Sequence, residues 1–138
     1  MSVYETDSVT LMDSILMSVR SACGVSEEDD GFDNQLIPLI NSYLMMGNHE
    51  LGIGRNGFVI TGPRETWTDW LGEAKDKLAS AVTWVGIRVL LAFDPPENSS
   101  VLKAYQETVN EMGWMLRSKS ELEGHSTTLY PVEYVEED

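Results

Sequence analysis

Residues 90–96 read Leu-Leu-Ala-Phe-Asp-Pro-Pro, an apolar run that stops at a double proline. Proline fixes φ and lacks the N–H that a helix interior needs, and the residue before a proline is displaced from the helical region. We therefore predict that one helix ends at Phe93 and that Asp94, Pro95 and Pro96 form a structural hinge. This stretch decides the fold because a second amphipathic pattern begins directly after it.

Two long helices are predicted to flank this hinge as an α–α corner over residues 74–122. The first runs from Glu73 to Phe93, and apolar residues cover well over half of its circumference. We expect it to be buried in the domain or to share its second face with another subunit. One face carries Leu78, Val82, Val85, Val89 and Ala92, with Ala81, Trp84, Arg88 and Leu91 beside it. The second follows cap candidates Asn98, Ser99 and Ser100, and its seam is Leu102, Tyr105, Val109, Met112 and Leu116.

Two further helices are predicted upstream. The first starts with a capping-box-like Thr10-x-x-Asp13 and ends at Gly24, and the second is capped by Asp33, with Pro38 near its first turn, and runs to about Gly47. Met45 and Met46 are interpreted as core. The apolar positions are Leu11, Ile15, Leu16, Val19, Ala22 and Cys23, then Leu36, Ile37, Leu39, Ile40, Tyr43 and Leu44.

Residues 47–66 are predicted to be irregular, with a short extended segment or hairpin near 57–62. Gly52-Ile53-Gly54-Arg55-Asn56-Gly57 matches the dinucleotide pattern G-x-G-x-x-G, but a helix precedes it and a strand-like run follows, the reverse of what pyrophosphate binding needs. We interpret it as a glycine-rich loop, with no cofactor. After it, Thr66 is expected to cap a short helix that carries Trp67 and Trp70.

Charge restricts the possible partners. The chain has 23 acidic and 9 basic residues in 138, a formal net charge of −14, and no basic cluster that would hold nucleic-acid phosphates. Residues 26–31 form an acidic loop that does not fit a calcium-binding EF-hand, because Ile37 falls where the bidentate Glu should be. We expect a solvated loop without a metal.

One helical domain is expected over residues 10–123, between a flexible arm at 1–9 and an extended acidic arm at 124–138. Met1–Glu5 has neither a basic nor an apolar signal region, and no apolar run is long enough for a membrane span. Cys23, the single cysteine, is interpreted as a buried free thiol. His49 and His125 lack metal-ligand spacing, and no nucleophile motif occurs, so an enzyme is not expected.

The chain resembles the head-to-tail connector (adaptor) family of tailed bacteriophages over roughly residues 10–120. The resemblance is carried by Phe93-Asp94-Pro95-Pro96, the Asn/Ser cap after it, and the ending Glu111-Met112-Gly113-Trp114-Met115-Leu116-Arg117. Upstream residues also follow the family's order, namely Asp33, Leu36, Ile37, Leu39, Ile40 and Asn41, then Leu51–Gly54, then Trp67–Leu71.

The resemblance implies a mainly α structural protein of the virion neck, assembled in the host cytoplasm. Such proteins form a ring of twelve copies under the portal, receive the stopper or tail, and continue the DNA channel without binding DNA tightly. A C-terminal arm engages the portal, which here assigns Thr127, Leu129, Tyr130, Val132, Tyr134 and Val135 by location and composition. The candidates for contacts between subunits are Trp84, Arg88, Leu91, Trp114 and Arg117.

Two other functions fit a small acidic chain. One is a DNA mimic that inhibits a host DNA-binding enzyme, which needs regularly spaced exposed carboxylates, whereas these acids gather at 27–33 and 133–138. The other is a different neck protein, a stopper or tail-completion protein, although such proteins are more often β-rich.

Overall fold

The computed structural model describes residues 13–72 and 77–121 and is mainly α-helical, as the sequence predicted. Among these residues no named strand occurs, and the sole β contact is an isolated antiparallel bridge between Ser14 and Thr66. The elements are α2 (Ile15–Ala22), α3 (Asp33–Met46), the π-helical turn η1 (Gly47–Leu51), α4 (Trp67–Leu71), α5 (Leu78–Phe93) and α6 (Ser99–Ser120).

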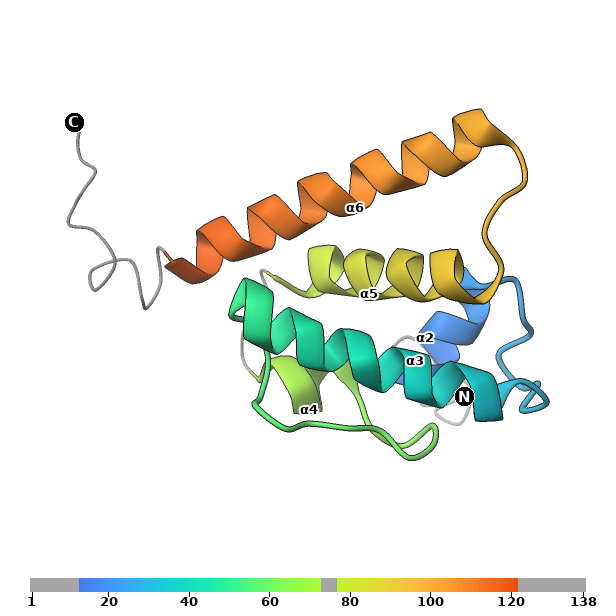
Figure 1. The fold of residues 1–138 in the computed structure, drawn as a ribbon. Helices are drawn as coiled ribbons and strands as arrows, with labels where there is room; N and C mark the ends of the chain where they lie inside the picture. The colour runs from blue at the N-terminus through green and yellow to red at the C-terminus, as the bar shows by residue number, and fades with distance from the viewer. Residues whose placement is uncertain (1–12, 73–76, 122–138) are drawn as a thin grey trace, which may run out of the picture.

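Helix α5 is central to the fold (Figure 1), with α2 and α3 on one side and α6 on the other. Its predicted apolar face is buried in the middle of the helix at Val85 and Val89 and partly buried at Val82, while Leu78 and Ala92 near its two ends are exposed. The helix is therefore a core element with exposed ends. The other core side chains come from every part of the described chain, among them Ile15, Leu16, Leu36, Ile40, Leu44, Ile53, Ile60, Trp67, Trp70 and Leu116.

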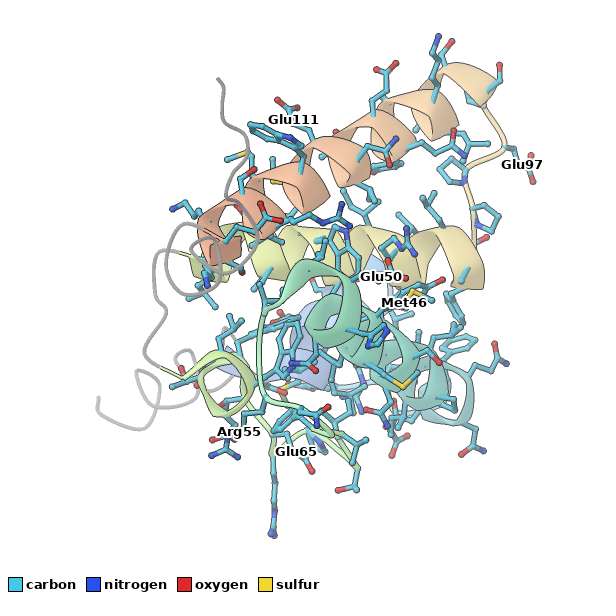
Figure 2. The ribbon with its side chains drawn as sticks, turned by 60° about the vertical axis from the view of Figure 1, so that its left-hand side comes forward. Met46, Glu50, Arg55, Glu65, Glu97 and Glu111 are labelled. Atoms are coloured by element: carbon cyan, nitrogen blue, oxygen red, sulfur yellow. The ribbon has the colours of Figure 1, made fainter. Side chains whose placement is uncertain are left out.

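The connection after α5 follows the proline prediction. Helix α5 ends at Phe93, Asp94 leaves the helical region with φ −156° and ψ 73°, and α6 starts at Ser99. The Asn98 side chain accepts hydrogen bonds from the backbone N–H groups of Ser100 (2.8 Å) and Val101 (3.1 Å), so the predicted cap is present. From this corner α6 converges on α5 toward its own C-terminal end (Figures 1 and 2).

The start of the first described helix differs from the prediction. Ser14 caps α2 by accepting a hydrogen bond from the Met17 N–H (3.2 Å), while its own hydroxyl donates to the Pro63 carbonyl (2.8 Å). Thr10 and Leu11, on which the earlier start depended, lie outside the described residues. The end is as expected, because Cys23 is the C-cap and Gly24 follows with φ +77°.

Asp33 does not cap α3, and that prediction was wrong. Its two carboxylate oxygens accept hydrogen bonds from Nε (3.1 Å) and Nη2 (2.7 Å) of Arg20, which is almost fully buried. The N-cap position belongs to Phe32, without a side-chain hydrogen bond. An ion pair across two helices replaces the local cap because a buried guanidinium needs a paired charge more than a helix end needs a cap.

The end of α3 also departs from expectation in one side chain. Met46 packs against the core, but Met45 is 67% exposed, so the core interpretation was wrong for Met45. The backbone then continues into η1 and stops at Gly52, whose φ of +73° suits glycine.

No strand or hairpin forms at 57–62 among the described residues. Instead Asn41 on α3 binds this segment, since its side chain donates to the Ile60 carbonyl (3.1 Å) and accepts from the Ile60 N–H (2.8 Å). The short helix α4 is present as predicted, and Thr66 and Asp69 form a reciprocal capping box at its start.

The glycine-rich stretch has a packing role. A Cβ atom on Gly54 would overlap the Trp70 indole, and a Cβ atom on Gly47 would lie 3.1 Å from the same ring. Two glycines from different segments thus allow the backbone to approach a fully buried tryptophan.

A candidate protein-docking groove

Two adjoining depressions lie where α6 converges on α5, beside the end of α3. The first, about 290 Å³, is lined by Tyr43, Arg88, Leu91, Ala92, Gln106, Val109 and Asn110. The second, about 220 Å³, is lined by Glu50, Leu51, Trp84, Arg88, Val109, Asn110, Gly113, Trp114 and Arg117. Because they share Arg88, Val109 and Asn110, we treat them as one surface, the docking groove. Figure 2 shows Met46 and Glu50 at the end of α3 that faces this region.

Arg88 lies where the two depressions meet. Its guanidinium carbon is 5.0 Å from the centroid of the Tyr43 ring and 5.2 Å from that of Trp84, within cation–π range. Nη2 also donates to the sulfur of Met46 (3.3 Å). These aromatic and sulfur partners fix the orientation of the Arg88 side chain but do not neutralise its charge. No carboxylate among the described residues forms an ion pair with Arg88, since the ion pair found there is Arg20–Asp33.

Trp114 and Arg117 form the other end of the groove. The Trp114 side chain is 69% exposed, the most exposed large apolar residue among those described. Arg117 Nε donates to the Glu50 backbone carbonyl (3.2 Å), which ties α6 to η1 without neutralising the guanidinium. Close approach of the helices here depends on Gly113, because a Cβ atom at that position would lie 3.2 Å from Trp84 Nε1.

The structure places four of the five predicted interface residues in the groove lining with substantial exposure, namely Arg88, Leu91, Trp114 and Arg117. Trp84 also borders it but is only 3% exposed, so its indole belongs mainly to the core of this subunit. Sequence reasoning did not single out Glu50, Gln106 or Asn110 as surface candidates. Gln106 and Asn110 could have been recognised from the sequence, because they lie on one helical stripe with Arg117.

The hinge residues 93–96 follow Ala92 at one end of the groove and are not part of its lining. Phe93 packs edge-on against Phe32, with ring centroids 5.5 Å apart and planes at 80°. Burial, followed by the nearby Asp94 carboxylate, raises the pKa of the Cys23 thiol from 9.0 to about 11. The predicted portal-binding residues Thr127, Leu129, Tyr130, Val132, Tyr134 and Val135 lie outside the described residues.

The groove has the composition of a protein-binding surface. Exposed tryptophan and arginine are the residues that most often dominate binding energy at interfaces, and Gln106 and Asn110 add polar groups at the edge.

Two groups with shifted pKa values lie outside the groove. Besides Cys23 there is Glu65, where burial would raise the pKa but hydrogen bonds, including those from Thr61, outweigh it and lower the pKa.

Two other kinds of site are absent from the described residues. Within the described residues, no group of three or more His, Cys, Asp or Glu side chains is arranged so that it could hold a metal ion. Among the helices of those residues, none combines the length and hydropathy that crossing a membrane requires.

Comparison with known proteins gives one match. A family model described as "Phage connector protein" matches residues 15–123, which includes every described element. No curated protein and no solved structure is significantly similar to the chain.

Proposed function

We propose, from the premise that this chain belongs to the phage connector protein family, that it is the adaptor of a tailed-phage neck. In this role it forms a ring of twelve copies under the portal, receives the stopper or tail, and continues the DNA channel once the head is filled. A connector is a structural component of the virion that contacts other head and tail proteins, and turnover of a substrate is no part of the role.

The docking groove is the observation that carries this proposal. Most apolar side chains of the described residues are used inside the subunit, yet Trp114 is 69% exposed next to Arg88 and Arg117. A monomer gains nothing from exposing a tryptophan beside two guanidinium groups that form no ion pair within the described part of the chain, whereas a subunit interface gains an anchor. We therefore assign the groove to contacts between proteins in the neck.

The net charge of −14 fits a conduit for DNA. Phosphates are repelled by an acidic surface, so the duplex moves past without being held. The same charge opposes self-association, and the portal then has a second task as the template on which subunits collect.

The C-terminal arm at 124–138 is proposed to engage the portal by adding a strand to its sheet. Residues 127–135 are rich in β-branched and aromatic side chains, and main-chain hydrogen bonds of an added strand supply affinity while alternate side chains supply specificity. Helix α6 ends at Ser120, which lines a depression together with Glu50 and Arg117 of the docking groove.

Cryo-electron microscopy of the purified virion neck tests the proposal. We expect a ring of this chain directly under the portal, with residues 124–138 against portal density. A chain truncated after residue 123 should lose co-sedimentation with purified portal. Absence of the chain from the virion, or binding to a host nuclease in competition with duplex DNA, would contradict the proposal.

A further inference from the structure

The acidic loop, residues 26–31, is the most concentrated patch of charge in the described chain. Glu28, Asp29 and Asp30 are exposed. The loop is held in shape from within, since the buried Arg20 donates from Nη1 to the Glu27 carbonyl (2.6 Å) and the Gly31 N–H donates to Asp29 Oδ1 (2.9 Å). No lysine or arginine of the described residues forms an ion pair with these carboxylates.

An exposed apolar side chain accompanies this charge. Phe32, the residue after the loop, is 40% exposed and rests on Phe93 at the end of α5. The acidic loop and Phe32 together therefore combine negative charge with an aromatic ring on a pre-shaped segment, so little conformational freedom would be lost on binding.

The docking groove carries the opposite combination. Its lining contains two arginines, Arg88 and Arg117, one carboxylate, Glu50, and the exposed ring of Trp114. With 9 basic residues against 23 acidic ones in the whole chain, two arginines on one surface that have no ion-pair partner among the described residues are a local reversal of its charge.

The acidic loop and the end of the docking groove that carries Glu50 and Arg117 lie at opposite ends of α3, while the Leu91–Ala92 end of the groove lies nearer to Phe32, beside Phe93. The acidic loop precedes the first residue of α3, and Glu50 in the groove belongs to η1, which follows its last residue (Figure 1). The 14 residues of α3 span about 21 Å at 1.5 Å per residue. Two different surfaces of one molecule that complement each other form a heterologous contact, which closes into a ring when the rotation between copies allows it.

We infer that the docking groove receives the acidic loop of the next copy of this chain, with Glu28 and Asp29 facing Arg88 and Arg117. Phe32 then packs beside Trp114 as the apolar part of the contact. Carboxylate–guanidinium hydrogen bonds are strong and directional, and they fix the register of neighbouring copies. The inference rests on the proposed ring and deepens it by naming the surfaces that join its subunits.

A charge-exchange experiment tests this contact, using full-length chains with purified portal as the template at about 150 mM salt. The groove variant is Arg117→Glu, and the loop variant combines Glu28→Lys with Asp29→Lys. Each variant alone should place like charges face to face and lower ring formation about tenfold or more, measured by sedimentation and negative-stain microscopy. Monomer circular dichroism and urea unfolding check that both variants fold.

Rescue is the decisive readout. In an equal mixture, the loop variant can place its lysines in the groove of the Arg117→Glu chain, and its own intact groove can receive the other chain's acidic loop. We expect rings of alternating chains from the mixture although neither variant forms them alone. The chain that carries all three substitutions should also form rings, because its altered groove and altered loop match.

A control variant separates this contact from net charge. Glu107→Lys with Glu111→Lys makes the same charge change as the loop variant, on two exposed positions of α6 that do not line the groove, and should leave ring formation unchanged or increased. Glu111 is labelled in Figure 2. Rings that persist in both single variants would overturn the inference while the proposed function stands. So would rings lost only on removing residues 124–138. If the unaltered chain forms no ring on the portal, the proposed function itself fails.

Discussion

Gly54 shows how one residue fixes the geometry of the irregular segment. Gly54 and Gly57 both have positive φ, +75° and +77°, but only at Gly54 would a Cβ atom overlap Trp70, whereas nothing lies within 4 Å of the position at Gly57. Replacing either glycine by alanine adds the same backbone strain. Comparing the two replacements therefore separates this strain from the steric overlap with Trp70.

We therefore expect Gly57→Ala to lower the free energy of unfolding by about 1–2 kcal/mol, the cost of left-handed backbone for alanine. Gly54→Ala should cost roughly 1–3 kcal/mol more, since the fully buried Trp70 must move. Urea unfolding followed by tryptophan fluorescence measures both. Equal losses in the two variants would mean that the contact with Trp70 does not constrain this loop.

Among the described residues, the Cys23 thiol has a pKa that the fold raises strongly. Its pKa of about 11, raised from 9.0 by burial and then by Asp94, makes the thiolate about a hundredfold rarer at pH 8 than in the unfolded chain. A raised pKa means that folding favours the neutral thiol. The stabilisation is therefore complete below pH 9 and is lost as the pH rises from 9 to 11.

Two measurements check this. Alkylation at pH 8 should be slow in the native protein and fast in urea. The free energy of unfolding should fall more steeply between pH 9 and 11 for the unaltered chain than for Cys23→Ala, which lacks the titrating group. Parallel pH profiles for the two chains would show that the native thiol titrates normally.

At the scale of elements, the cap of α6 determines where the second long helix begins. Asn98 accepts two backbone hydrogen bonds at the helix start, while the neighbouring Glu97 side chain makes no such contact. Asn98→Ala should lower the free energy of unfolding by about 1 kcal/mol, and Glu97→Ala should change it by less than about 0.5 kcal/mol. Urea unfolding with circular dichroism at 222 nm measures both, and no difference between the variants would contradict the capping role.

The elements that the sequence predicted correctly are those whose signals are local. Proline at 95 and 96 ends α5, Asn98 starts α6, Thr66 starts α4 and Gly24 ends α2. Each of these depends on a few consecutive residues and on backbone geometry, so neighbouring sequence is enough.

The predictions that failed depend on partners distant in the chain. Asp33 resembles a helix cap, yet 13 residues separate it from the arginine that it binds. The hairpin alternative at 57–62 does not form, because Asn41 satisfies the Ile60 backbone from α3, 19 positions away in the chain. The docking groove follows the same rule. The sequence alone indicated its exposed tryptophan and arginines as interface candidates, but it did not indicate that η1 contributes to the same surface.

At the scale of the whole molecule, two electrostatic effects oppose each other. The net charge of −14 repels a second copy at long range, while the acidic loop and the docking groove attract one at short range. Long-range repulsion is screened by salt far more than a partly buried contact is. Association should therefore need salt or a template, and a ring of twelve would multiply the repulsion of a single pair.

We expect the isolated protein to be monomeric or weakly associated at about 10 mM salt, where the Debye length is about 30 Å. At about 150 mM salt this length falls to about 8 Å, and the weight-average mass from sedimentation equilibrium should rise because repulsion weakens while the contact remains. Neutralising Glu107→Gln and Glu111→Gln, which lie outside the groove, should shift the rise to lower salt. A stable ring at about 10 mM salt without portal would contradict this balance, because short-range contacts would then overcome the unscreened charge unaided.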